Sequence, residues 1–102
     1  MALDFLELKD LHGVAIFLIS DGMTRNVSKM ERLAVELKVL TKYQIIVLSA
    51  RDSDAKKVFD FYDLIPGNSV LLVRDSDELH HSWVGNEIPS ASQIAHIANQ
   101  IG

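Results

Sequence analysis

The chain of 102 residues contains no cysteine, so it can form no disulfide bond, no thiolate nucleophile and no cysteine-ligated zinc site. Aromatic residues make up only 7% of the chain, so aliphatic side chains must supply most of the core. Long apolar runs are also missing: the run near the start, Val14 to Ile19, is far too short to span a bilayer. No basic region precedes an apolar stretch at the N-terminus, so we expect no signal peptide and a cytoplasmic protein.

Clustered positive charge is absent as well. The net charge is −4, and a protein of this charge lacks the basic patches that neutralise phosphates. We therefore expect neither a nucleic-acid partner nor an anionic membrane surface. The 48% of hydrophobic residues suffices for a core, and the length predicts a single domain over residues 1–102.

What is present is a regular alternation of strand and helix patterns. Apolar periodicity and turn residues predict a helix over Ala2–Leu11, a strand over Val14–Ile19, a helix over Thr24–Thr41 and a strand over Tyr43–Ser49. They then predict a short helix whose apolar stripe runs over Ala55–Tyr62, strands over Ser69–Arg74 and Leu79–Val84, and a last helix that ends near Ile101. The first two strands are joined by a long helix, so we expect them to be parallel. The last two are joined by a short turn, which predicts an antiparallel hairpin.

The two early strands are continuous apolar runs, which predicts burial on both faces and helices on both sides of the sheet. For the helix over Thr24–Thr41, the expected cap is Thr24, or Ser28 with Glu31. The expected cap of the short helix is Ser53 or Asp54, and that of the last helix is Ser90 with Gln93. Leu79, His81 and Trp83 alternate along their strand and are expected on one face. The expected core comprises Ile16, Leu18, Leu33, Leu37, Ile46, Leu48, Phe59, Leu71, Val73, Ile94 and Ile97.

Three segments resemble a known family. Phe61–Val73 looks like the helix end, loop and third strand of thioredoxins, Glu78–Val84 with Gly85-Asn86 looks like their fourth strand and Val-Gly pair, and Ile88–Ile101 looks like their last helix. The resemblance implies a thioredoxin-like α/β fold. This fold is a three-layer sandwich with a four-stranded mixed sheet in the order 4-3-1-2 and helices on both faces.

The chemistry of that family is missing in this chain. Gly22-Met23-Thr24-Arg25 stands where thioredoxins have Cys-x-x-Cys, Ile16 replaces their buried Asp, Leu48 or Ser49 replaces their partner Lys, and Asn68 falls at their cis-proline. Thiol–disulfide exchange needs a thiolate, so this activity is excluded. Because neither Asn68 nor Ser69 is proline, we expect trans peptide bonds on both sides of Asn68.

The resemblance, with its chemistry missing, implies a non-catalytic binding or adaptor module. We expect no cofactor, and no metal site because no two of the four histidines have ligand spacing on a common face. The family's partner groove, carried onto this chain, comprises Gly22, Met23, Thr24, Arg25, Asn68, Ser69, Gly85 and Asn86. The expected partner is another protein, and the chain itself is expected to be a monomer or a weak homodimer. The amides at the start of the helix after Gly22, together with Arg25, would favour an anionic group of the partner.

Two alternatives remain open. Ile19–Thr24, Ile46–Arg51 and Val73–Asp77 resemble the short motifs of haloacid-dehalogenase-type phosphatases, which suggests a hydrolytic activity using Asp21 or Asp75. However, Ile19 stands at that family's nucleophilic Asp, and isoleucine cannot form an aspartyl intermediate. The other alternative is a structural subunit that dimerises through the edge of the second strand or through the Trp83 face.

Overall fold

The computed structural model describes residues 13–75 and 78–102, so the helix expected over Ala2–Leu11 lies outside the described residues. The elements are β1 (Val14–Ser20), α2 (Thr24–Leu40), β2 (Gln44–Ser49), α3 (Ser53–Phe61), β3 (Ser69–Arg74), β4 (Glu78–Val84), the 3-10 turn η1 (Gly85–Glu87) and α4 (Ala91–Ile101). Within these residues, the alternation predicted from the sequence is confirmed, with ends that differ by one or two residues.

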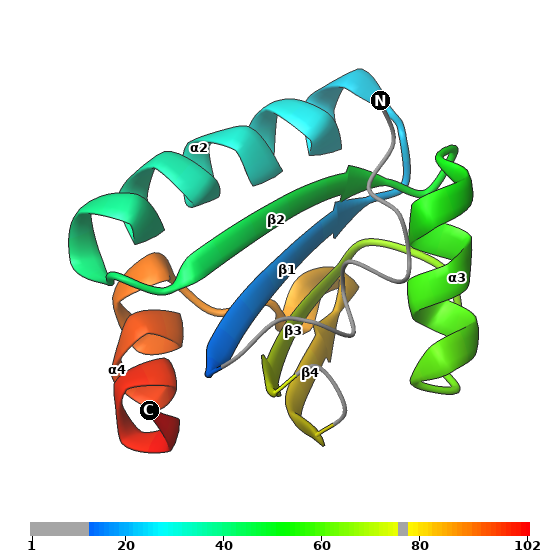
Figure 1. Cartoon of the computed structure of the whole chain (residues 1–102). Coiled ribbons are helices and arrows are strands. Elements are labelled where there is room, and N and C mark those ends of the chain that lie inside the picture. The colour runs from blue at the N-terminus through cyan, green and yellow to red at the C-terminus, as the bar shows by residue number, and fades with distance from the viewer. Residues whose placement is uncertain (1–12, 76–77) are drawn as a thin grey trace.

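The four strands form one mixed sheet in the order β2-β1-β3-β4 (Figure 1). β1 and β2 are parallel, as the helical crossover between them requires. β3 is antiparallel to β1 and to β4. The predicted order 4-3-1-2 is therefore confirmed, and it places β1 and β3 at the centre of the sheet.

Helices cover both faces of this sheet and create two apolar cores. α2 and α4 pack on one face, over Ile16, Leu18 and Leu72. α3 packs on the other face, over Phe17 and Leu71. All seven residues of β1 are buried because its side chains alternate between the two cores. The predicted core residues are buried except Ile97, which is partly exposed at the margin of the α2–α4 layer.

The expectation that the second strand is buried on both faces is wrong. β2 alternates between buried Ile46 and Leu48, which face α3, and exposed residues such as Val47. The reason is its place in the sheet. An edge strand has one neighbour, and helices that cover the sheet centre leave part of its surface open.

β4 also departs from the predicted pattern, because a bulge interrupts its pairing with β3. Leu72 lies opposite His81, whereas Val73 lies opposite Leu79, so His80 is the extra residue. Leu79 therefore packs in the α3 core and Trp83 packs against the α2–α4 core. Leu79 does not share a face with His81 and Trp83, contrary to the simple alternation.

The helix starts are only partly as predicted. α4 begins as expected, with the amide of Gln93 donating to Ser90 Oγ at 3.4 Å. The cap of α2 is Met23 rather than Thr24 or Ser28, and the cap of α3 is Asp52 rather than Ser53 or Asp54. Neither Met23 nor Asp52 caps its helix through its side chain. Before α2, the amide of Met23 donates instead to the carboxylate of Asp21, as described below.

Candidate functional site

Three loops meet at the end of the sheet where β1 and β4 end and β3 begins. Ile19 pairs with Ser69, and Ser69 pairs with Val84, so these residues form a row across β1, β3 and β4. The loops that contain Gly22, Asn68 and Gly85 continue directly from this row. The fold thus brings together the three segments that the resemblance assigns to a partner groove.

Asn68 holds the three loops together. Its side-chain Oδ1 accepts a hydrogen bond from the amide of Asp21 at 2.7 Å. Its backbone carbonyl accepts another from the amide of Gly85 at 3.0 Å. All peptide bonds of the described residues are trans, including those around Asn68. At the place of a cis-proline the chain therefore has an asparagine whose amide side chain bridges to the loop after β1.

The carboxylate of Asp21 binds the residue before α2 and a side chain of its first turn. Its Oδ1 accepts from the amide of Met23 at 2.9 Å, and the side chain of Asn26 donates to both carboxylate oxygens at 3.1 and 3.0 Å. A weaker bond of 3.4 Å comes from the Asn68 side chain. The amide of Met23, and then the side chains of Asn26 and Asn68, hold the pKa of Asp21 below its usual value of 3.8.

This arrangement places a negative charge beside the start of α2, which weakens the expected attraction for an anionic ligand. The expected attraction came from unpaired amides and the helix dipole, but the carboxylate of Asp21 already lies at this end. A second negative group would meet like charge there. Thr24 and Arg25 are exposed in the first turn of α2, and Asn86 is exposed in η1. We therefore expect the loops to favour an uncharged ligand surface.

An apolar groove adjoins the same loops. It has a volume of about 570 Å³ and runs from the loop between α3 and β3 to the end of β4. Three of the residues predicted for the site, Asn68, Ser69 and Gly85, line it. Two exposed large apolar residues, Ile65 and Val84, line it, and their exposed fractions are 85% and 49%.

The sequence analysis did not predict the groove residues Ile65 and Val84 or the roles of Asp21 and Asn26. A signal for Asp21 was present, since an aspartate in a turn commonly accepts a bond from the amide two residues later. No local pattern marks the pairing of Asp21 with Asn68, because these residues are 47 positions apart.

The geometry gives no support to a site that combines the two aspartates suggested by the phosphatase-like motifs. Asp21 follows the carboxyl end of β1. Asp75 instead lies beside Gly13, which precedes the amino end of β1. The amide of Asp75 donates to the carbonyl of Gly13, and the amide of Gly13 donates to Asp75 Oδ1, both at 2.8 Å. The intervening strand separates the two by about 25 Å at 3.3 Å per residue. β3 runs antiparallel to β1, so the carboxyl end of β3, which Asp75 follows, lies beside the amino end of β1.

No group of three histidine, aspartate or glutamate side chains in residues 13–75 and 78–102 is arranged to hold a metal ion. Among these same residues, no helix is long and apolar enough to cross a membrane.

Acidification should loosen the network around Asp21. Its pKa is lowered in the folded chain, so its stabilising effect is complete above the ordinary value of 3.8 and is lost as pH falls through the lowered folded value. We expect the amide resonance of Met23 and the side-chain amide of Asn26 to shift together in that acid range. An NMR pH titration measures this, and Asp21→Asn should abolish the shared titration. If the Met23 amide resonance titrates in the Asp21→Asn variant as it does in the wild-type chain, Asp21 is not the group whose protonation it reports.

Comparisons with known proteins agree on the fold. No protein-family model matches the sequence, and no curated protein matches it. Among solved structures, a mutant thioredoxin from Halobacterium salinarum superposes with a TM-score of 0.71 at 11% identity, covering 93% of this chain and 80% of that one. A chain from a structure described as the basis of the thiol-resolving mechanism in a yeast mitochondrial 1-Cys peroxiredoxin via glutathione/thioredoxin systems gives 0.65 at 8% identity, covering 94% and 86%. Trxlp from Edwardsiella tarda gives 0.62 at 13% identity, covering 92% and 89%. These likenesses show that the chain has the thioredoxin-like fold.

Proposed function

We propose that this cysteine-free chain of thioredoxin-like fold is a non-catalytic binding module for another protein, and that the groove beside Asn68 receives an extended apolar segment of the partner. The observation that carries the proposal is the coincidence of two features. The three loops of the predicted partner surface converge on Asn68, and an apolar groove opens beside them.

The exposed side chains of the groove support this choice. Ile65 and Val84 both line it, and both are large apolar residues left in contact with water. Covering such residues with a partner's apolar side chains removes that area from water, which favours binding. The side chain of Ser82 and the backbone of the loop supply a few polar groups that would orient the segment.

The groove is tested with peptides selected from a random library displayed on phage, using the immobilised full chain as bait. The selected peptide is then titrated into isotopically labelled protein. We expect shifts centred on Ile65–Ser69 and Val84–Gly85, and we expect Ile65→Asp to weaken the affinity roughly tenfold or more, because it places a charge against an apolar partner surface.

Val39→Asp is the matched control. Val39 is also a large apolar residue, 83% exposed, but it lies on α2 and outside the groove. Its variant should bind the peptide with unchanged affinity. Equal losses in both variants, or shifts confined to α2 and β2, would contradict the proposed function.

A further inference from the structure

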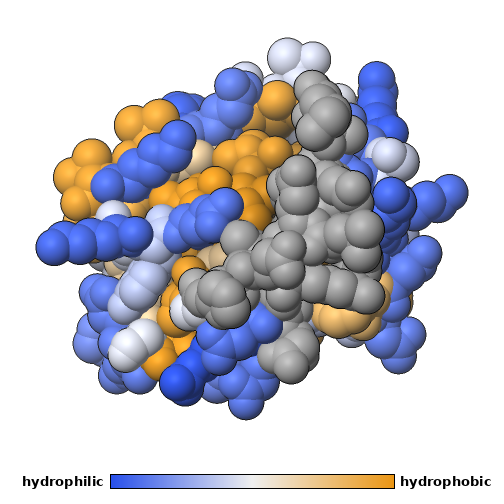
Figure 2. Space-filling model, in the orientation of Figure 1, coloured by the Kyte–Doolittle hydropathy of each residue, from blue (hydrophilic) through white to orange (hydrophobic). Residues whose placement is uncertain are grey.

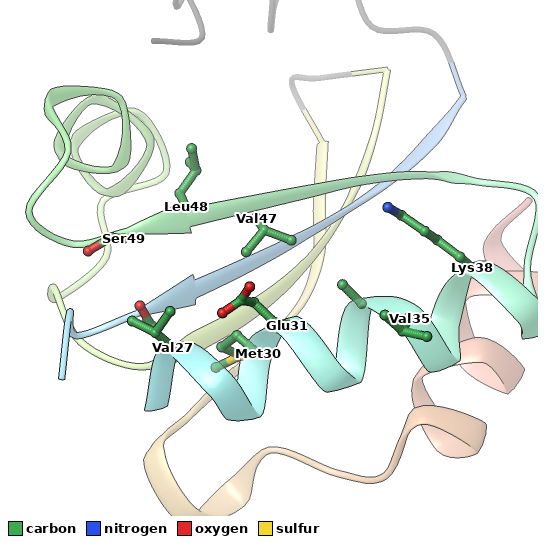
Figure 3. A pocket seen from close by; sticks show the side chains of 10 residues that line it. Val27, Met30, Glu31, Val35, Lys38, Val47, Leu48 and Ser49 are labelled. Carbon is green, nitrogen blue, oxygen red and sulfur yellow. The ribbon is translucent and has the colours of Figure 1, made fainter. Parts of the chain in front are cut away.

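The groove beside Asn68 carries one sign of charge. Among the described residues that line it, Asp63 is the only charged one, and it lies in the loop after α3 together with Ile65. The cavity of about 470 Å³ between α2 and β2 differs, because Glu31 and Lys38 both extend from α2 toward β2 there (Figure 3). Figure 2 shows apolar residues gathered over the α2 side of the molecule, crossed by long polar side chains. Of these two hollows, only the groove presents a single negative charge beside its apolar surface.

Asp63 closes α3 at a position that usually belongs to glycine. Its backbone is left-handed, with φ of +57°, and its amide donates to the carbonyl of Asp60 at 3.3 Å. The next amide, that of Leu64, donates to the carbonyl of Phe59 at 2.8 Å. This pair of bonds is the Schellman motif, in which glycine avoids the strain that a Cβ atom brings. An aspartate therefore ends the helix here at a cost that glycine would not have.

The charge of Asp63 is also unfavourable for this helix. The C-terminal end of a helix carries a partial negative charge, which basic side chains stabilise and acidic ones destabilise. α3 has no basic residue in its last turn, and Asp60 already adds a carboxylate there. No described residue donates a hydrogen bond to the carboxylate of Asp63 or forms an ion pair with it. Nothing in the described part of the chain thus offsets the cost of an exposed acid at this position.

We propose that Asp63 makes the groove selective for a partner segment in which a cationic side chain, lysine or arginine, adjoins the apolar residues. The inference rests on the proposed function and names the chemistry of its partner. A cation at Asp63 would offset both negative features of this helix end, and the apolar surface beside it would reduce the screening of the pair by water. The apolar part of the segment would cover Ile65 and Val84, which line the same groove.

The test starts from the peptide selected on the immobilised full chain. We expect this peptide to carry a lysine or arginine next to its apolar residues. A matched peptide has that residue replaced by an uncharged analogue of similar shape, acetyl-lysine for lysine or citrulline for arginine. We expect the uncharged peptide to bind the wild-type chain about three- to fivefold more weakly, which is the effect of one exposed ion pair. The difference should shrink as the salt concentration is raised.

Asp63→Asn is the decisive variant. Asparagine also adopts the left-handed conformation, so the change removes the charge and keeps the turn. The charged and uncharged peptides should bind this variant with equal affinity. Two matched controls each remove one carboxylate outside the groove: Asp60→Asn in the last turn of α3, and Glu31→Gln beside the cavity between α2 and β2. Both controls should keep the wild-type preference for the charged peptide.

Asp63→Gly tests the folding argument separately. Glycine relieves the left-handed backbone and removes the acid from the helix end, so the urea midpoint of unfolding should rise. The same variant should lose the preference for the charged peptide. A lowered midpoint would show that Asp63 stabilises the turn, and it would overturn the inference.

The outcomes distinguish this inference from the proposed function. Ile65→Ser removes apolar surface without adding a charge, so it should weaken the binding of both peptides alike. If it does so, but the wild-type chain binds the two peptides equally or Asp63→Asn keeps the preference, the charge selectivity is wrong and the apolar groove stands. If no selected peptide binds in the groove, both proposals fail.

Discussion

Replacing Leu71 with alanine is expected to lower the free energy of unfolding by about 2–5 kcal/mol, because the change leaves a cavity in a packed core. Leu71 is fully buried on β3, between β1 and β4, and belongs to the core under α3 with Phe17 and Phe59. A position enclosed by two strands and a helix cannot collapse around a missing side chain, so the cost should not fall to the low values typical of a surface site.

Urea unfolding followed by circular dichroism measures this loss. Val39→Ala is the control, since it removes a side chain of similar kind from an exposed position of α2, and it should change the stability by no more than about 0.5 kcal/mol. If Leu71→Ala cost under about 1 kcal/mol, well below the range for a closed core site, the placement of β3 in the sheet would be wrong.

Gly22→Ala is expected to cost about 1–2 kcal/mol, because the left-handed backbone conformation is strained for any residue with a Cβ atom. Gly22 has φ of +91°, and a Cβ atom there would lie 2.8 Å from Nε of Arg51. Its amide also donates to Ser20 Oγ at 3.3 Å, so the loop cannot simply relax to an extended conformation without breaking this bond.

The Arg51→Ala background separates the two causes in this loop. Arg51 has a flexible, exposed side chain, so removing it relieves the close contact but not the backbone strain. Gly22→Ala should therefore remain destabilising in that background, as measured by the same urea titration. A cost that disappears with Arg51 would show that the contact, and not the backbone conformation, requires glycine. The family's first cysteine falls at this glycine, so the same strain would oppose restoring it.

The helices and strands were largely predictable because their signals are local. The buried run Val14–Ile19 and the stripe of Met30, Leu33 and Leu37 identify β1 and α2 from spacing alone. The start of α4 at Ser90 is equally local, since its bond joins residues three positions apart. The cap of α2 was not predicted, because no capping side chain marks it; the carboxylate of Asp21 instead accepts from the amide of Met23 and from the side chain of Asn26.

The candidate site was predictable in outline only. Likeness to a known family placed the loops of Gly22, Asn68 and Gly85 together, and the register of β1, β3 and β4 agrees. The bridge from Asn68 to Asp21 joins residues far apart in the chain, so no periodicity could reveal it. That bridge, with the bonds from Met23 and Asn26, places the carboxylate of Asp21 beside the start of α2, which local patterns could not show.

The sequence by itself determined which residues prefer helix or strand, and it excluded thiol chemistry, because both depend on composition and on neighbours along the chain. Only the tertiary structure decided which strand lies at an edge and which side chains share a face. Val47 is apolar like its neighbours, yet it is exposed because β2 has a single partner strand in the described part of the chain. Leu79 and Trp83 lie on opposite faces of the sheet because a bulge adds one residue between them, which alternation within one strand cannot show. In each case the deciding interaction is with another segment, and packing between segments is a property of the whole fold.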